Sequence, residues 1–344
     1  MSPKLLLICA VVLLVSAVGQ SQVDYTYYSS IPTGAALGGV ALKPDGDLYY
    51  VTFAAANSEL VYVQNALLGY ATSTITTEVL PTGRGLNDIA VDSAGNVYIS
   101  GTGTAAADSV LKKFSAAPSH TELWSNIDYR HNGIELITDD ILAIGQTWNV
   151  IVFKNTSDGS DTGTSVSGGS RYQRAFAFNT ANDDIYAAKN GDYSDAALKV
   201  FSGGSPTNLS GYALALDDQL SPLGVSTQYG TATQPVDYDP INDQLLMGDT
   251  ANQAIGESTG GVRVYDISGS GASTSFTEAQ FVDRRDATYY YSNVYGISYA
   301  NVTAFSPPRE FLAIAANVTD GTDSFYSIEL FRRVPLSVED WADY

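Results

Sequence analysis

Cysteine, histidine and positive charge are scarce in this sequence. Among 344 residues there is one cysteine, Cys9, there are two histidines, and 17 Lys and Arg stand against 37 Asp and Glu, which gives a net charge of −20. So few basic residues cannot form a face that neutralises phosphates, and nucleic acid is therefore excluded as a partner. A single cysteine excludes a disulfide framework, and two histidines disfavour a metal centre built from imidazoles.

The sequence also lacks helical periodicity. No long window repeats apolar residues at the spacing of a helix face, and 31 glycines with many Thr, Ser and Asn disfavour helix further. Hydrophobic residues make up 44% and charged residues 16%, a balance that supplies a core and is too apolar for a disordered acidic chain. We therefore expect an all-β globular protein.

Residues 1–19 have the layout of a secretory signal peptide. Lys4 supplies the positive charge, and Leu5–Val18 forms the apolar run. Ala17 and Gly19 are the small residues that a signal peptidase requires. The run is shorter than the about 20 residues of a membrane span. We predict cleavage after Gly19, a secreted protein in the extracellular space or a periplasm, and no membrane span in the mature chain.

A short unit recurs six times along the mature chain. It consists of an apolar strand, a turn rich in Asp, Asn and Gly, and a second apolar strand. The second strands of the six copies begin at Leu48, Val97, Ile141, Ile185, Leu245 and Phe311. Their spacing matches the about 40–50 residues of a propeller blade, lengthened twice by loop insertions.

Each copy is followed by a third strand with an apolar and often aromatic centre. These strands are Leu60–Val63, Val110–Phe114, Val150–Phe153, Leu198–Phe201, Val262–Tyr265 and Ile328–Phe331. A more polar fourth strand follows in units one, two, four and five, as at Thr74–Val79 and Phe276–Phe281. Neighbouring blades bury the inner strands on both faces, which explains apolar runs inside and polar residues outside.

The third and sixth units have no clear fourth strand. In unit three the stretch Asn155–Ser170 is typical of a surface loop, with a doubtful strand near Thr164–Val166. In unit six nothing follows Phe331, while Val23–Tyr28 alternates in polarity and has no partner. We therefore predict a six-bladed β-propeller over residues 20–334 whose N-terminal strand closes the last blade, because closure removes the open seam. A β-sandwich or two all-β domains are the alternatives.

Two segments carry a family resemblance. The segment Arg84–Tyr98 is the best match to a known blade motif, and Asn132–Gly133 is a partial one. With the repeats, the chain resembles the six-bladed propellers of the NHL and gluconolactonase-like superfamily, which includes the senescence marker protein family. The resemblance implies a divalent ion, usually calcium, held on the axis by a Glu, an Asn and an Asp that is also the general base in lactone opening. It places Asn87 in the axial site and makes Asn132 the calcium-binding Asn.

The chain departs from that family pattern at two positions. Ala35–Gly39 stands where the family has its Glu, and Asp237 lies two residues after Pro235 rather than one. Asp237 is still the candidate base and, with Asn132, a candidate metal ligand. The leading hypothesis is a secreted, non-enzymatic binding or structural module, and the alternative is a calcium-dependent, lactonase-like hydrolase.

Other candidate groups have a structural as well as a functional interpretation. His131 adjoins Asn132 at the expected axial end of blade three, and it is either a proton acceptor or a plain turn histidine. Acidic pairs such as Asp139–Asp140 and Asp183–Asp184 offer the oxygens that calcium prefers. Asp and Asn also cap tight turns and tolerate left-handed backbone, which is the simpler explanation.

Tyrosine is abundant, at 23 residues. Tyr289, Tyr290 and Tyr291 stand in a long insertion before the last blade, where exposed tyrosines suit the recognition of a protein or a sugar. They either form such a surface or cover the hydrophobic edge of the last blade. The expected partner is therefore an extracellular protein or glycan.

Self-assembly is a further hypothesis. If Val23–Tyr28 adds to the last blade of a neighbouring copy, ring closure becomes an intermolecular joint. The predicted acidic tail, residues 335–344, offers Trp341 and Tyr344 as a second contact. The partner is then a second copy of this chain.

Four N-glycosylation sequons are present. They begin at Asn155, Asn208, Asn301 and Asn317. A glycan is attached at such a motif only in a secretory pathway that has the transferring enzyme, so the motifs predict modification only in a source with that pathway.

Overall fold

The structure is a computed structural model of the whole chain. It describes residues 23–54, 56–80, 85–103, 109–126, 131–146, 148–171, 175–188, 197–218, 220, 235–249, 260–284 and 289–335. The predicted signal peptide, residues 1–19, lies outside these residues, and so does the predicted tail, residues 335–344, apart from Pro335. Within the described residues we find no helix with the length and hydrophobicity of a membrane span.

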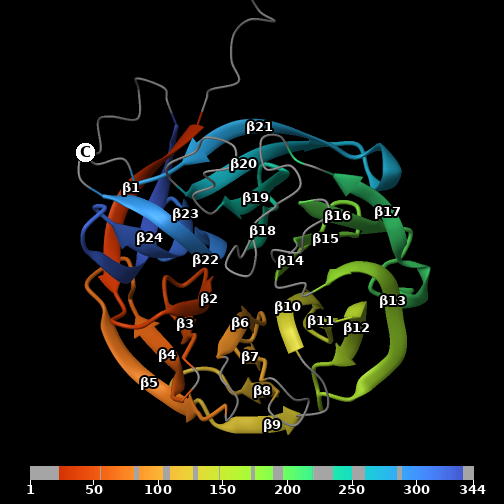
Figure 1. Cartoon of the computed structure of the whole chain (residues 1–344), viewed down its shortest axis with the longest axis horizontal. Helices are drawn as coiled ribbons and strands as arrows, with labels where there is room; N and C mark the ends of the chain where they lie inside the picture. The colour runs from red at the N-terminus through yellow and green to blue at the C-terminus, as the bar shows by residue number, and fades with distance from the viewer. Residues whose placement is uncertain are drawn as a thin grey trace, which may run out of the picture.

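Six four-stranded antiparallel sheets stand around a common axis as the blades of a propeller (Figure 1). From axis to rim, blade one consists of β2 (Leu37–Leu42), β3 (Leu48–Thr52), β4 (Ser58–Gln64) and β5 (Ala71–Glu78). Blade two consists of β6 (Leu86–Val91), β7 (Val97–Gly101), β8 (Val110–Phe114) and β9 (Glu122–Asn126). Blade three consists of β10 (His131–Thr138), β11 (Ile141–Gln146), β12 (Trp148–Asn155) and β13 (Asp161–Arg171). Blade four consists of β14 (Ala175–Asn179), β15 (Asp184–Ala188), β16 (Leu198–Ser202) and β17 (Ala213–Asp218). Blade five consists of β18 (Val236–Asp239), β19 (Gln244–Asp249), β20 (Gly261–Ser268) and β21 (Ser275–Val282). Blade six consists of β22 (Tyr290–Val302), β23 (Arg309–Thr319), β24 (Ser324–Pro335) and β1 (Val23–Pro32). Two short 3₁₀ helices, η2 (Leu209–Gly211) and η4 (Gly271–Ser273), lie between the third and fourth strands of blades four and five. The predicted six-bladed β-propeller is confirmed.

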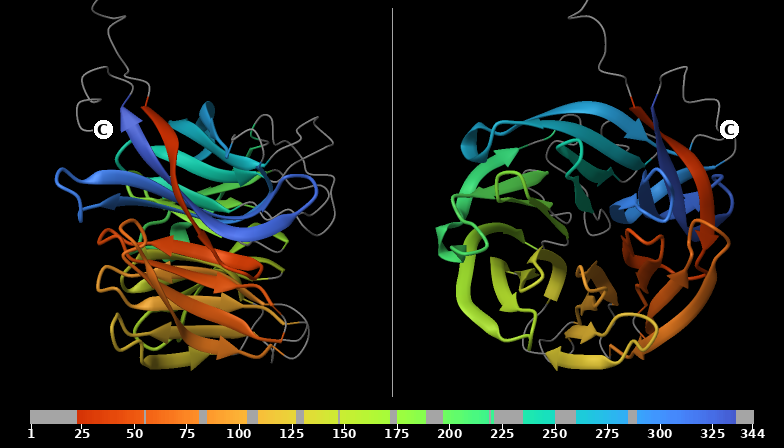
Figure 2. Two further views of the ribbon diagram at one scale, coloured as in Figure 1. Left: turned by 90° about the vertical axis from the view of Figure 1, so that its left-hand side faces the viewer. Right: turned by 180° about the vertical axis from the view of Figure 1, so that it is seen from behind.

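The first and last strands of the chain share one sheet. β1 pairs antiparallel with β24, from Val23 opposite Pro335 to Pro32 opposite Ser327. Figure 2 shows β1 in red beside β24 in blue. This pairing confirms that the N-terminal strand closes the last blade. Self-assembly through the same strand stays a prediction, and it requires this pairing to open.

The inner strands of the blades are much more buried than the rim strands. Every residue of β2, β3, β15 and β19 is buried, whereas the rim strands β5 and β9 are mostly exposed. The large buried side chains are mainly aromatic, among them Tyr49, Tyr98, Tyr186 and Phe153. At about 25 cal/mol for each Å² of apolar surface, this burial is the main stabilising contribution in a chain without disulfides.

Acidic residues cap the turns between first and second strands. In blade two, Asp92 Oδ1 accepts a hydrogen bond from the Asn96 N–H at 2.8 Å, and Asp92 Oδ2 accepts one from the Tyr98 hydroxyl at 2.9 Å. Asp183 and Asp243 adopt left-handed backbone in the corresponding turns of blades four and five, with φ of 63° and 52°. These roles account for the acidic residues of the repeat as turn chemistry.

Blade three has a complete fourth strand. β13 extends from Asp161 to Arg171 and pairs with β12, so the interpretation of Asn155–Ser170 as a surface loop is wrong from Asp161 onward. The buried Lys154 ammonium pairs with Asp161 Oδ1 at 2.8 Å and fixes one end of the strand. Composition is a poor guide here, because a rim strand rich in Thr, Ser and Gly differs little from a loop.

Contacts to β24 and to the turn after β4 hold β1 in the ring. The Tyr27 ring packs edge-on against Phe331 of β24, with centroids 5.8 Å apart. The Tyr28 hydroxyl donates a hydrogen bond to the Leu67 carbonyl of blade one at 2.9 Å. Ile31 is 1% exposed and packs in the core that blades one and six share. The strand is therefore part of the core as well as of the sheet.

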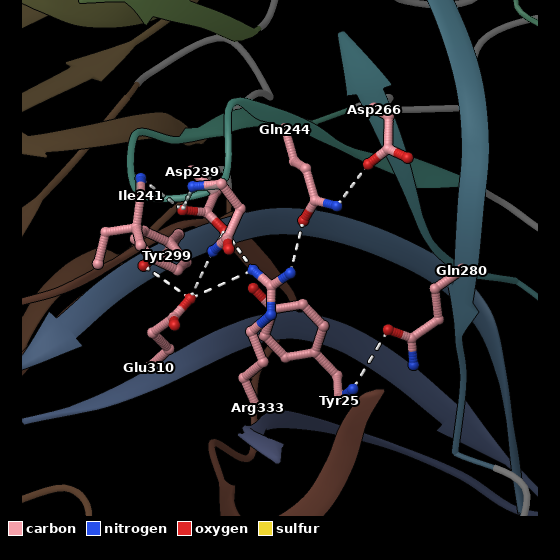
Figure 3. A network of polar contacts seen from close by, with 10 residues as sticks. Tyr25, Asp239, Ile241, Gln244, Asp266, Gln280, Tyr299, Glu310 and Arg333 are labelled. Carbon is pink, nitrogen blue, oxygen red and sulfur yellow. Dashed lines mark hydrogen bonds and ion pairs between the residues drawn. The ribbon is translucent and has the colours of Figure 1, made fainter. Parts of the chain in front are cut away.

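A buried polar network joins blade six to blade five (Figure 3). The Arg333 guanidinium of β24 donates hydrogen bonds to Asp239 of β18 and to Glu310 of β23, the latter at 3.2 Å. It also donates to Gln244 Oε1 of β19 at 3.0 Å. The Arg333 and Asp239 side chains are 7% and 0% exposed. Burying two charges costs solvation, and these additional hydrogen bonds offset part of that cost.

We predict that Ile31→Ala lowers the free energy of unfolding by about 2–5 kcal/mol, because it removes a buried side chain and leaves a cavity in the shared core. Thr26→Ala on the same strand is the control, since Thr26 is exposed and its truncation changes stability by about 0.5 kcal/mol or less. Denaturant titration measures both. Equal losses in the two variants would show that β1 does not belong to the ring.

We also predict that Arg333→Met destabilises the protein by about 3–5 kcal/mol, because Asp239 is left buried without its cation. The double variant Arg333→Met/Asp239→Asn removes both charges and is expected to be more stable than Arg333→Met alone. Thermal or denaturant unfolding of the two variants decides this. A single variant as stable as the wild type contradicts the role given to this ion pair.

Candidate functional site

A cavity lies on the propeller axis between the first strands of all six blades. Its volume is about 200 Å³, and its lining comes from β2, β6, β10, β14, β18 and β22, the strands that surround the centre of Figure 1. Three of the lining residues are carboxylates: Asp88 on β6, Glu135 on β10 and Asp237 on β18. None of the described lining residues is Lys, Arg or His. The cavity is therefore acidic, and its described lining supplies no cation.

Backbone N–H groups of adjacent blades hold two of these carboxylates in place. Asp88 Oδ2 accepts a hydrogen bond from the Ile134 N–H of blade three at 2.9 Å. Asp237 Oδ2 accepts one from the Tyr299 N–H of blade six at 2.6 Å. Each carboxylate also accepts the N–H of the residue that follows it, at 2.9 and 2.7 Å. The two side chains thus join neighbouring first strands as well as facing the cavity.

Glycines bring the first strands of blades one, two and six together beside the cavity. A Cβ atom on Gly39 would lie 2.8 Å from Asp88 Oδ1, and one on Gly38 would lie 2.2 Å from the Leu86 carbonyl oxygen. A Cβ atom on Gly296 would lie 2.9 Å from the Gly39 Cα. Glycine at these positions therefore permits an approach that any side chain would block, and it places Asp88 against β2.

Burial raises the pKa of all three carboxyl groups. Loss of solvation raises the pKa of Asp88 and of Asp237 to about 7, although the backbone N–H groups that each accepts lower it. The pKa of Glu135 is raised well above its ordinary value, first by burial and then by the negative charges of Asp237 and Asp88. The cavity therefore holds protons at a pH where exposed carboxyl groups have lost them.

This arrangement can exchange protons for a cation near neutral pH. A positively charged group in the cavity stabilises the ionised carboxylates, lowers their pKa and releases their protons. A carboxylate whose pKa lies near 7 also has the range of a general base. Both kinds of chemistry use the same three side chains.

The structure places the predicted polar residues at different sites. Asp237 lines the axial cavity, and neither Asn87 nor Asn132 does. The two amides are buried and are joined through Thr102: Asn87 Nδ2 donates to Thr102 Oγ1 at 2.7 Å, and Thr102 Oγ1 donates to Asn132 Oδ1 at 3.3 Å. The backbone of His131 opens β10, where His131 pairs with Gln146. The binding roles of Asn87, Asn132 and His131 stay predictions.

These positions do not fit the calcium site that the family resemblance implies. Gly39 lies in the segment where the family has its Glu, and Asn87 and Asn132 bind Thr102 instead of facing the cavity. In the part of the chain that the structure describes, no three His, Cys, Asp or Glu side chains are grouped so that they could hold one ion. The described residues therefore do not form the calcium site of that family, and the metal roles of Asn132 and Asp237 stay predictions.

The three consecutive tyrosines are packed in and beside blade six. Tyr290 and Tyr291 belong to β22, and Tyr291 is fully buried in the core between blades five and six. The Tyr289 ring packs edge-on against Phe325, with centroids 5.7 Å apart, and the Arg284 guanidinium lies 5.2 Å from the centre of the same ring. The expected placement in an insertion before the last blade is therefore wrong for Tyr290 and Tyr291, which belong to β22, and the burial of Tyr291 agrees with the alternative that the tyrosines cover the edge of that blade. Binding by Tyr289 and Tyr290 stays a prediction.

The sequence pattern did not single out Asp88 and Glu135. Each is the charged residue of a first strand whose other cavity-lining residues are apolar. A strand that neighbouring blades bury on both faces has room for a charge only toward the axis, because an unpaired charge between packed blades is too costly. A lone carboxylate in such a strand is thus the signal that identifies both residues.

Comparison with known proteins establishes the fold and no family. No protein-family model matches the sequence, and no curated protein matches it either. Among solved structures 755 chains match. One of them, from a structure entitled "Crystal Structure of Mitotic Checkpoint Complex", has a TM-score of 0.54 and 10% sequence identity, over 90% of this chain and 96% of that chain. At this identity the likeness shows the β-propeller fold alone, and the NHL and gluconolactonase-like resemblance stays a prediction.

The axial carboxylates predict how stability depends on pH. In the unfolded chain the pKa values of these carboxyl groups are about 4. They are higher in the folded state, so the folded state holds these protons more tightly. The stabilising contribution of Asp88 and Asp237 is fully present below a pH of about 4 and is lost as the pH rises through about 7, at about 1.4 kcal/mol for each unit of pKa difference. The contribution of Glu135 also falls as the pH rises above about 4, because its pKa is raised in the same direction. In Glu135→Gln this group no longer titrates, and we expect a flatter fall of the melting temperature between pH 4 and 8.

Asp320→Asn provides the control for that experiment. Asp320 is in the turn before β24, and its pKa is lowered by backbone N–H groups, first that of Asp323 and then that of Thr322. Its contribution therefore has the opposite sign and is lost as the pH falls. Melting curves of the wild type and Glu135→Gln that stay parallel across this range contradict the raised pKa of Glu135.

Proposed function

We propose that the protein is an exported, non-enzymatic binding module whose axial cavity accepts a positively charged group of an extracellular partner protein. One observation carries the proposal: Asp88, Glu135 and Asp237 line a cavity whose described lining contains no cation. An ionised carboxylate in such surroundings is unfavourable until a cation compensates it. A lysine or arginine side chain brings that cation with an aliphatic stem that suits the apolar part of the lining.

The charge of the whole chain supports the same kind of partner. A net charge of −20 attracts a basic protein at distances shorter than the screening length of the salt. This attraction increases the rate at which the two proteins associate. The similar solved chain comes from a structure whose title names a complex. Residues 1–19 supply the secretory signal that places the module outside the cell.

Binding at this site is expected to release protons. Because their pKa values are raised to about 7, Asp88 and Asp237 are largely protonated at pH 5 and largely ionised at pH 8, and the pKa of Glu135 is raised in the same direction. A cation therefore binds more tightly as the pH rises through about 7, because fewer protons have to leave. Binding that weakens over this range, or that does not change, contradicts the proposed site.

The test uses n-butylammonium chloride as a probe for the end of a lysine side chain. At ten times its dissociation constant the probe stabilises the folded protein by about 1.4 kcal/mol, which raises the melting temperature of a chain of this size by about 2 °C. An equal concentration of sodium chloride controls for screening. We expect the rise at pH 8 in the wild type, a smaller one at pH 5, and little or none in Glu135→Gln.

Asp320→Asn is the matched variant, because it removes one carboxylate from an exposed turn. It is expected to keep the full response to the probe. Equal responses in the wild type and both variants would mean that the probe senses only the overall charge, and the proposal would then be wrong. Glu135 is preferred to Asp88 or Asp237 for the test, since those two also accept backbone hydrogen bonds between blades.

The hydrolase alternative rests on a different observation. Asp237 lies on the axis, and burial raises its pKa to about 7, so its carboxylate could take a proton from water that attacks a lactone. A panel of lactones measured with the wild type and Asp237→Asn tests this function. Hydrolysis by the wild type that disappears in the variant would replace the non-enzymatic proposal.

A further inference from the structure

We infer that Asn208 accepts an N-linked glycan in a secretory pathway that has the transferring enzyme, and that Asn317, which has the same motif, does not. The inference rests on the exported state included in the proposed function. The oligosaccharide is transferred while the chain enters the secretory pathway, and the finished glycan is a bulky group that only a surface position accommodates. The folded structure therefore shows at which of the four motifs a glycan can be carried without disrupting the fold.

Asn208 lies in an exposed turn between β16 and β17, directly before η2. The hydroxyl of Ser210, the third residue of the motif, donates a hydrogen bond to Asn208 Oδ1 at 3.2 Å. Gly211 has no side chain, and a Cβ atom there would lie 2.6 Å from Asn208 Nδ2. Among the described residues we find no acceptor for that nitrogen, so the atom that takes the glycan is free.

Asn317 lies in the interior of a sheet. It belongs to β23, where it stands opposite Asn293 of β22 on one side and Tyr326 of β24 on the other. Its Oδ1 atom is buried. The hydroxyl of Thr319, the third residue of its motif, donates to the Asp323 carbonyl at 2.7 Å instead of to the amide. Asn317 is half-buried between two paired strands, so a glycan here would crowd the packing of blade six.

The other two motifs are also engaged within the fold. Asn155 ends β12, and its Nδ2 donates to Ser160 Oγ at 2.9 Å. Asn301 stands opposite Glu310 in the sheet, and Thr303 of its motif donates to the Pro44 carbonyl at 3.1 Å. Of the four motifs, Asn208 alone combines exposure, the hydroxyl-to-amide contact and a free amide nitrogen among the described residues.

The modification needs a lipid-linked oligosaccharide as its second substrate. A bond forms between Asn208 Nδ2 and the anomeric carbon of the first sugar, and the bond from that carbon to the pyrophosphate oxygen breaks. The lipid pyrophosphate leaves with the electron pair, and the amide nitrogen loses one proton. Asn208 is in a turn toward the rim, whereas first strands line the axial cavity, so the glycan leaves the cavity open.

The test is expression of the full chain in cultured animal cells, followed by peptide mass spectrometry after enzymatic deglycosylation in heavy-oxygen water. We expect most secreted molecules to carry the label at position 208 and none to carry it at position 317. Ser210→Ala removes the motif while keeping the acceptor and is expected to abolish the label at 208. Ser210→Thr keeps the motif and is expected to retain it.

A second arm separates this inference from the proposed export. In that arm an established leader replaces residues 1–19, and the cell-associated protein is analysed with the secreted protein. Label at 208 in this arm, with no secretion from the chain's own leader, supports the glycosylation site and overturns the proposed export. An unlabelled position 208 in secreted protein from either arm, or a folded secreted product labelled at 317, overturns the inference.

Discussion

The pairing of β1 with β24 is the constraint on which the rest of the structure depends. The blades are successive along the chain, so only a strand from the opposite end can complete the last sheet and close the ring. Without closure, β24 would present an unpaired edge and the first strands would have no fixed axis to surround. The contacts of Ile31 and the buried ion pair of Arg333 with Asp239 tie this last blade to both of its neighbours.

A closed ring explains why carboxylates occur at its centre. Six first strands converge there, and the backbone N–H groups of one strand reach side chains of the next, as Ile134 does for Asp88 and Tyr299 does for Asp237. These hydrogen bonds stabilise ionised carboxylates, while burial favours the protonated form, and burial dominates. The result is a set of groups that hold protons near neutral pH and can give them up to a cation. In the proposed function, binding and protonation are coupled through these carboxyl groups.

The sequence predicted the ring better than it predicted the site. Six copies of one strand–turn–strand unit and the unassigned strand Val23–Tyr28 were enough for blade number and closure, because both depend on polarity patterns that span the chain. β13 was predicted only as a doubtful strand near Thr164–Val166, since Thr, Ser and Gly on a rim strand resemble a loop. The family pattern indicated Asn87 and Asn132 and not Asp88 and Glu135. The two amides bind Thr102 and do not line the cavity. A lone carboxylate in an otherwise apolar first strand was the available signal, but the register between blades that brings Asp88, Glu135 and Asp237 to one cavity is not contained in one sequence.

The central claim is that ring closure creates an axial cavity whose carboxyl groups stay protonated where exposed ones do not. Infrared difference spectroscopy of the folded protein measures this directly, because the carbonyl stretch of a protonated carboxyl group is separate from the bands of its ionised form. We predict a protonated-carboxyl band that persists at pH 6, weakens as the pH is raised to 8 because Asp88 and Asp237 ionise, and is weaker in Glu135→Gln. A folded protein whose carboxyl groups are all ionised at pH 6 would contradict it.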